Sequence, residues 1–135
     1  MLHVVHVIRD LDIASGGPSR SVPALAECQS CLPGIMVTVL YRDRGNPIVT
    51  LGQCSVKYHA IGKKHLLFPE SYLKTIQSKS DQSESIIFHL HGLWSPFLHL
   101  AARFAARKNL PYVVSVRGML SSWCLGHKSL KKKLD

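Results

Sequence analysis

Residues 86–116 read IIFHLHGLWSPFLHLAARFAARKNLPYVVSV and carry the pattern of a strand, a helix and a second strand. The apolar run Ile86–Leu90 predicts a buried strand, because strands covered on both faces are apolar throughout. Ser95 and Pro96 suit the N-cap and the first position of the helix. The helix then presents one apolar face, made of Phe97, Leu100, Ala101, Phe104 and Ala105. Its end is set by Asn109 and Pro111, and the next strand is expected at Tyr112–Val116.

The N-terminal half shows the same alternation of apolar runs and helical patterns. Strands are expected at Leu2–Ile8, Met36–Tyr41 and Val56–His59. A helix should follow Ser15-Gly16-Gly17-Pro18, but Pro23 would clash with the carbonyl four residues before it. The helix therefore either begins as late as Ser21 or bends at Pro23. Further helices are expected at Phe68–Lys79 and over Lys128–Leu134.

Strands joined by helices indicate right-handed crossovers and a parallel sheet, so we expect an α/β protein with a Rossmann-like fold. Five strands in the order 3-2-1-4-5 would place Leu2–Ile8 beside Ile86–Leu90. Ligands bind such sheets at the switch point, where the connections from two neighbouring strands leave in opposite directions. Three loops would converge there, at residues 15–20, 91–95 and 117–119.

The composition of the 135-residue chain suits one domain with a hydrophobic core, since 46% of the residues are hydrophobic and 19% are charged. The net charge of +9 favours an anionic partner. No apolar run approaches the ~20 residues of a membrane-spanning helix, and the N-terminus has no basic leader of the secretory type. Four cysteines are too few for a disulfide scaffold, and the Cys28-x-x-Cys31 pair is interpreted as structural. We therefore expect a soluble protein of a reducing compartment.

The first converging loop offers groups that could bind an anion. Gly16 and Gly17 precede a helix, so the backbone could approach an anion while the first helical N–H groups point at it. The same pair also suits a plain strand-to-helix turn. Arg20 could add a charged clamp, or it could simply be solvated.

The other two loops offer polar and aromatic side chains. His91, at a strand end, could bind a sugar hydroxyl or a phosphate, and Trp94 could stack on a sugar ring or cover the core. Arg117 could hold a phosphate oxygen, with Gly118 allowing close approach. His89 and His91 share one strand face, but no Asp, Glu or Cys lies near them in sequence. No metal site is expected, and His89 is interpreted as a hydrogen-bonded core histidine.

Three motifs occur in order along the chain: SGGPSRSVPAL at residues 15–25, HLHGLWSP at 89–96 and PYVVSVRGML at 111–120. Together they resemble the N-terminal domain of the GT-B glycosyltransferases of family 4, in particular bacterial members that build lipopolysaccharide, capsule or exopolysaccharide. The resemblance covers nearly the whole chain as a single domain, residues 1–135, and is loose over residues 42–85. The second and third motifs are specific in combination.

The resemblance implies a retaining enzyme that moves a sugar from a nucleotide-sugar donor to a glycan or lipid-linked acceptor without a cofactor or a required metal. In that family the N-terminal domain mainly binds the acceptor, and a Gly-rich loop, matched here by Gly16 and Gly17, lies near the donor diphosphate. A histidine that often contacts the donor sugar is replaced in this chain by Arg117. The implied location is the cytoplasm, with peripheral contact at the inner membrane face.

The second, donor-binding domain of the family has no counterpart in these residues, and the Lys-rich end lies within a helical pattern. We therefore expect a fragment, a truncated gene product or a lone acceptor-side half, inactive alone because the transition state would lack most of its electrostatic support. The lysines of residues 128–133, with Trp123 and Leu125 nearby, form either a solvated face or a contact with an anionic membrane.

Other protein classes fit these motifs less well. A dinucleotide-binding oxidoreductase needs G-x-G-x-x-G, which residues 15–18 do not supply, and Gly62-Lys63-Lys64 lacks the other residues of a P-loop. The chain has no regular aromatic and basic platform, so no nucleic-acid partner is expected. A non-catalytic half of a split transferase and a nucleotide-binding Rossmann-like domain remain alternatives.

Overall fold

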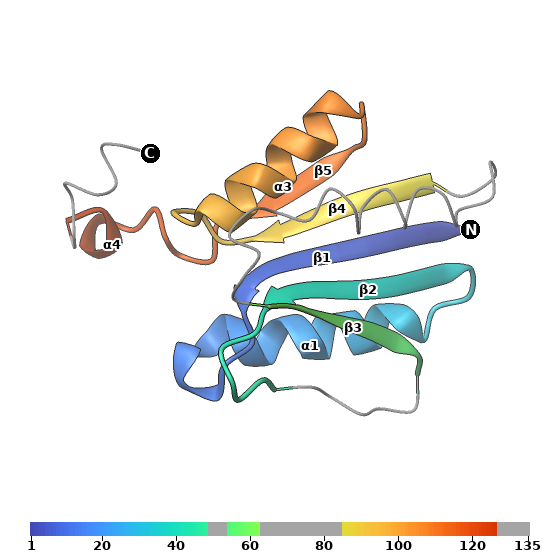
Figure 1. Ribbon diagram of the computed structural model, residues 1–135, viewed down its shortest axis with the longest axis horizontal. Coiled ribbons are helices and arrows are strands. Elements are labelled where there is room, and N and C mark those ends of the chain that lie inside the picture. Colours follow the sequence, from blue (N-terminus) through green and yellow to red (C-terminus); the bar gives the residue numbers. More distant parts are fainter. Residues whose placement is uncertain (49–53, 63–84, 127–135) are drawn as a thin grey trace.

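The computed structural model describes residues 1–48, 54–62 and 85–126, which form a sheet between two helices (Figure 1). The strands are β1 (Leu2–Asp10), β2 (Ile35–Arg42), β3 (Val56–Ile61), β4 (Ser85–His91) and β5 (Tyr112–Ser115). The helices are α1 (Gly17–Ser30), α3 (Pro96–Arg107) and the short α4 (Ser122–Gly126), and a 3-10 turn η1 (Ile13–Ser15) precedes α1. The expected strands are confirmed. The helices expected at Phe68–Lys79 and Lys128–Leu134 lie outside the described residues.

The sheet has the order β3-β2-β1-β4-β5, and every neighbouring pair of strands is parallel. This confirms the predicted Rossmann-like α/β fold and its strand order. β1 and β4 lie side by side, and the chain leaves β1 through α1 toward β2 but leaves β4 through α3 toward β5. All five carboxyl ends point to the same edge of the sheet, beside the start of α1 (Figure 1). The switch point expected from the sequence is therefore at this edge.

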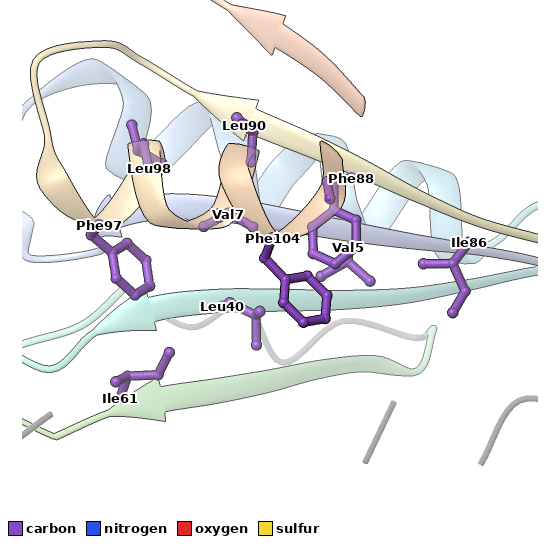
Figure 2. Close-up of a cluster of buried hydrophobic side chains, with 12 residues drawn as sticks. Val5, Val7, Leu40, Ile61, Ile86, Phe88, Leu90, Phe97, Leu98 and Phe104 are labelled. Atoms are coloured by element: carbon purple, nitrogen blue, oxygen red, sulfur yellow. The ribbon is translucent and has the colours of Figure 1, made fainter. Parts of the chain in front are cut away.

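One face of the sheet packs against α3. Phe97 and Phe104 of α3 reach over the sheet toward Leu40 of β2, and Val5 and Phe88 lie in the same cluster (Figure 2). Because side chains alternate along a strand, the odd positions of β1 and the even positions of β4 supply this core. The burial of α3 here confirms the predicted apolar face, except that Leu98 is fully buried while Leu100 is only partly buried.

The opposite face packs against α1. Val22 and Ala26 of α1 contact a second apolar cluster that contains Ile8, Val37 and Val39. The even positions of β1 point to this side, so His6 lies on the same face as Ile8. The register places His6 opposite His89 of β4. Histidines of β1 and β4 are therefore brought together under α1.

The start of α1 differs from one alternative that the sequence left open. The helix begins at Gly17, with Pro18 in its first turn, and continues through Pro23. The alternative that it begins as late as Ser21 is therefore wrong. Pro23 lacks the N–H that would bond to the carbonyl four residues earlier, but it is buried together with Val22 and Ser19. This packing against the sheet offsets the missing hydrogen bond.

The start of α3 also differs in detail from the prediction. Ser95 is the N-cap residue and Pro96 follows it, as expected, but the Ser95 side chain makes no capping hydrogen bond. The Ser95 carbonyl instead accepts from the backbone N–H groups of Leu98 at 3.0 Å and His99 at 3.1 Å. Ser95, which is buried, therefore contacts the first turn of α3 through its backbone carbonyl and not through its hydroxyl.

The cysteines also depart from the sequence expectation. Cys31, directly after α1, forms a disulfide with Cys54, two residues before β3. Cys28 is free and exposed. The bond ties the end of α1 to the segment that leads into β3, so Cys31 is structural as expected, but the expectation of a fully reduced protein does not match this structure.

Within the described part of the chain, no helix is long and apolar enough to cross a membrane.

Candidate functional site

The three loops predicted to converge do meet at the carboxyl edge of the sheet. The Arg117 guanidinium contacts Ser21 Oγ of α1 at 3.1 Å and His91 Nδ1 of β4 at 2.9 Å. The Trp94 indole Nε1–H donates to the carbonyl of Met119 at 3.4 Å. These contacts join the segments after β1, β4 and β5, which are far apart in the sequence, into one site.

A pocket of about 220 Å³ opens at this site. Its lining combines polar residues with apolar ones: Ser15, Ser19, His91 and Asp10 are polar, and Leu93, Trp94, Leu98 and Met119 are apolar. The volume is below the usual range of ~300–1,000 Å³ for small-molecule pockets. It is therefore suited to a single ring or to the end of a longer ligand.

Of the residues predicted to form the site, His91 and Trp94 line the pocket directly. Gly16 and Gly17 do not line it, but Ser15, Pro18 and Ser19 on either side of them do. Arg20 is exposed on the first turns of α1 and does not line the pocket. Arg117 and Gly118 also lie outside its lining. The structure thus places Arg117 at the junction of the loops, in contact with His91, and not in the pocket wall.

The backbone at this edge adopts unusual conformations. Gly16, the N-cap of α1, has φ 90° and ψ −156°, which a residue with a Cβ rarely adopts. Gly92 has φ 104°, and a Cβ there would lie 3.0 Å from the Met119 side chain. Trp94 (φ 47°) and Arg117 (φ 51°) are in the left-handed region without being glycine. Such conformations cost of order 1–3 kcal/mol each and concentrate at functional sites.

A hydrogen-bonded histidine network lies behind the pocket. His91 Nε2 is 2.8 Å from His6 Nδ1, and His6 Nε2 is 2.6 Å from Gln29 Oε1 of α1. Both ring nitrogens of His91 are therefore engaged within the protein, since Nδ1 meets Arg117. A ligand could bond to a ring nitrogen of His91 only by opening one of these contacts. His89, half-buried, lies 2.7 Å from Ser115 Oγ, as expected for a hydrogen-bonded histidine.

Burial keeps the central histidines neutral. Burial lowers the pKa of His6 to about 4, although its hydrogen bond to Gln29 Oε1 acts in the opposite direction. Burial, with the nearby His89, His6 and Arg117, lowers the pKa of His91 to about 2. Both rings therefore carry no charge at neutral pH, and the network contains a single full charge, on Arg117.

Sequence reasoning missed His6 and Gln29. The ring nitrogens of His6, His89 and His91 lie within 4.8 Å of one another, which is close enough for a metal ion. The predicted strand order could have indicated that these histidines meet, because His6 lies opposite His89 once β1 is placed beside β4. The contact to Gln29 could not be predicted, because it depends on the height and rotation of α1 over the sheet.

Asp10 was also missed. Its side chain, 1% exposed at the end of β1, meets Arg9 at 2.8 Å and Arg44 at 3.4 Å. Burial alone would raise the pKa of Asp10, but hydrogen bonds from Ser15 and Arg9 outweigh it and lower that pKa. Asp10 therefore stays ionised at neutral pH, and its carboxylate oxygens accept from Arg9, Arg44 and the backbone N–H of Asp12.

Arg117 differs from Arg9 and Arg44 in having no carboxylate partner. Both ion pairs in the described residues use Asp10, so no acidic side chain among them neutralises Arg117. Its Nε–H is buried without a hydrogen-bond partner. The edge of the sheet at the start of α1 consequently carries an excess of positive charge, to which the helix N-terminus adds.

Comparisons of the chain with known protein families, with curated proteins and with solved structures find no match.

Proposed function

We propose that this chain is the acceptor-binding, N-terminal domain of a retaining glycosyltransferase with the GT-B architecture. The observation that carries the proposal is the convergence of the three motif-bearing loops on one pocket at the switch point of the sheet. Ligands of open α/β sheets bind at this position. The motif resemblance supplies the reaction class, and the chemistry of the pocket agrees with a sugar.

The lining of the pocket combines apolar and polar side chains, as a sugar ring requires. The indole of Trp94 and the Met119 side chain offer a surface for the C–H face of a pyranose. Ser15 and Ser19 contribute hydroxyl groups to the polar part of the lining, which suit the hydroxyls of a sugar. The volume of about 220 Å³ suits one ring, which would be the terminal sugar of a glycan or lipid-linked acceptor.

The positive charge at the edge of the sheet beside the pocket favours the binding of an anionic group. The Gly16–Gly17 turn opens α1, whose N-terminus carries a partial positive charge. Arg117 has no acidic partner among the described residues, and Arg20 is exposed in the first turn of the helix. This combination suits the diphosphate of a nucleotide-sugar donor, whose nucleotide would be held by a second domain. In such an enzyme the chain would position the acceptor against the donor sugar at the cytoplasmic face of a membrane.

The proposal is tested by the fluorescence of Trp94. The chain has two tryptophans, so Trp123→Phe leaves Trp94 as the single indole reporter of the pocket. Titration with N-acetylglucosamine, galactose, glucose and mannose should give a saturable change for at least one sugar, with a millimolar Kd typical of a single ring. The matched variant Trp94→Phe, which retains Trp123, should give none.

Two results would contradict the proposal. Emission from Trp94 that does not change with any of these sugars would argue against a sugar site. A saturable response to NAD in the micromolar range, without a response to sugars, would instead support a dinucleotide-binding domain.

A further inference from the structure

A continuous line of side-chain hydrogen bonds crosses the molecule beneath α1. It runs from Arg117 to His91 Nδ1 (2.9 Å), from His91 Nε2 to His6 Nδ1 (2.8 Å) and from His6 Nε2 to Gln29 Oε1 (2.6 Å). His6 is 0% exposed and His91 is 3% exposed, so water does not compete for these groups. The line starts at the carboxyl edge of the sheet and ends in the last turn of α1, on a residue that does not line the pocket.

The direction of this line is fixed at both ends, by the donor Arg117 and by the acceptor oxygen of Gln29. A guanidinium only donates hydrogen bonds, so His91 Nδ1 must be the acceptor and carries no proton. The neutral ring of His91 then holds its proton on Nε2 and donates it to His6 Nδ1. His6 in turn holds its proton on Nε2 and donates it to Gln29 Oε1. All three bonds form together only when both rings are neutral Nε2–H tautomers.

We propose that this line is a positioning relay, in which Gln29 and His6 hold His91 in the tautomer that accepts from Arg117 and so fix the guanidinium at the edge of the sheet. Gln29 and His6 are positioning residues, because they act through His91. The role of Arg117 toward an anion rests on the proposed function, but the direction of the relay does not. Neutral His6 and His91, both with strongly lowered pKa values, are what the relay requires.

The ring nitrogens of His6, His89 and His91 could instead bind a metal ion, and such a site would compete with the relay. A metal at His6 Nδ1 and His91 Nε2 would displace the proton that these atoms share and place a dication beside Arg117. His91 would then accept from Arg117 on one nitrogen and bind the metal with the other, as an imidazolate. Metal-bound histidines normally donate their second N–H to an acceptor, so the contact with Arg117 favours the relay.

The first measurement is the tautomeric state of the ring nitrogens by ¹⁵N NMR of the folded protein at neutral pH. We expect His6 and His91 both to be neutral, with the proton on Nε2. A proton on Nδ1 of either ring, or a charged ring, would overturn the relay. Loss of both Nε2–H signals on addition of one equivalent of Zn²⁺ would also overturn it, since it would identify a metal site.

The second measurement tests positioning with Gln29→Met, which keeps the length of the side chain but cannot accept the His6 proton. We expect a mixture of His91 tautomers and about fivefold weaker binding of pyrophosphate, the effect of losing one hydrogen bond. The control is Thr38→Val, which removes the hydrogen bond between Thr38 and His3 on the other face of β1. It should leave the His91 signals and the pyrophosphate affinity unchanged.

The outcomes separate the relay from the proposed function. If the tautomers are as expected but the unaltered protein does not bind pyrophosphate, the relay stands and the anion-binding part of the proposed function fails. If Gln29→Met folds and leaves His91 in a single Nε2–H tautomer, Gln29 does not position His91 and the relay is overturned. If Gln29→Met does not fold, the tautomers of His6 and His91 in the unaltered protein decide whether the relay stands.

Discussion

Two residues with a positive φ, Trp94 and Arg117, lie at the carboxyl edge of the sheet, where the candidate site is. In the part of the chain that the structure describes, the residues other than glycine with a positive φ are Trp94, Asn109 and Arg117. Asn109 follows the end of α3, where a left-handed residue is an ordinary helix terminator. Trp94 and Arg117 end no helix; they lie at the carboxyl ends of β4 and β5 and both contact neighbouring loops. The hydrogen bonds of Trp94 to Met119 and of Arg117 to His91 hold these two conformations. Strained backbone of this kind concentrates at functional sites.

The buried histidines make stability depend on pH. His6 and His91 take up protons near pH 6.5 when unfolded, but only at about 4 and about 2 when folded. Between those values the unfolded chain binds more protons, so the free energy of unfolding falls as the pH falls below 6.5. His6 alone accounts for a loss of about 3 kcal/mol by about pH 4. The half-buried His59 and His89 add to the loss, since burial lowers their pKa values too.

Urea unfolding at several pH values between about 7.5 and about 4.5 measures this effect. Asp10 contributes little in that range, because its pKa of 3.8 in the unfolded chain already lies below it and folding lowers that pKa further. The variant His6→Gln should have a flatter pH profile than the unaltered protein. A free energy of unfolding that is constant down to pH ~4.5 would contradict the buried, neutral state of both rings.

At the scale of single elements, α3 carries much of one core. Phe104 is 4% exposed, and its ring centroid lies 6.3 Å from that of Phe88 on β4. We expect Phe104→Ala to lower the free energy of unfolding by roughly 3–5 kcal/mol, because it removes a buried ring and leaves a cavity. The matched variant Leu100→Ala, at a partly buried position of the same helix, should cost less. A loss below ~1 kcal/mol for Phe104→Ala, measured by urea unfolding, would mean that this face of α3 is not packed on the sheet.

Elements were more predictable than the contacts between them. The period of apolar residues gives the strands and α3 directly, because burial on the sheet imposes that period. The strand order followed from the handedness of the crossovers. The helix start at Gly17 could not be decided, since only tertiary packing tells whether Pro23 is tolerated inside the helix.

The candidate site was predictable in its position but not in its internal bonds. The convergence of the loops at residues 15–20, 91–95 and 117–119 follows from the topology alone. The partners of His91 do not, because His6 and Gln29 are 85 and 62 residues away from it in the chain. Their contact depends on the rotation of α1 and on side-chain rotamers, which apolar periodicity does not encode. The disulfide between Cys31 and Cys54 was missed for the same reason.

At the scale of the whole molecule, exposed apolar side chains are unevenly distributed. Among residues 1–48, 54–62 and 85–126, seven of the eleven exposed large hydrophobic residues lie in β5 and the segment after it, residues 112–125. Leu120, Trp123 and Leu125, which are 52%, 75% and 43% exposed, belong to the segment whose Cys124 lines the pocket. A concentration of this kind is typical of a surface that contacts a partner or a membrane.

An anionic membrane is the partner that the charge favours. The chain has a net charge of +9, and four lysines follow this segment within residues 128–133. Basic residues next to exposed Trp and Leu are the combination that binds the interface of anionic lipids. A lipid-linked acceptor would then reach the pocket from the same surface that holds the protein at the membrane. We therefore expect the protein to sediment with vesicles that contain phosphatidylglycerol, and to do so less as salt is added.

The contribution of the apolar part is tested with Trp123→Ser, which should weaken binding to these vesicles about tenfold, since a buried aromatic side chain contributes on the order of 1.5–3 kcal/mol. The control is Leu32→Ser, because Leu32 is also an exposed apolar residue (52%, against 75% for Trp123) but lies between α1 and β2, at the opposite edge of the sheet. It should bind as the unaltered protein does. Equal binding of the unaltered protein to vesicles of phosphatidylcholine alone would rule out the role of charge. Equal binding of Trp123→Ser and Leu32→Ser would mean that the exposed residues near the pocket face something other than lipid, and the acceptor would then have to reach the pocket from solution.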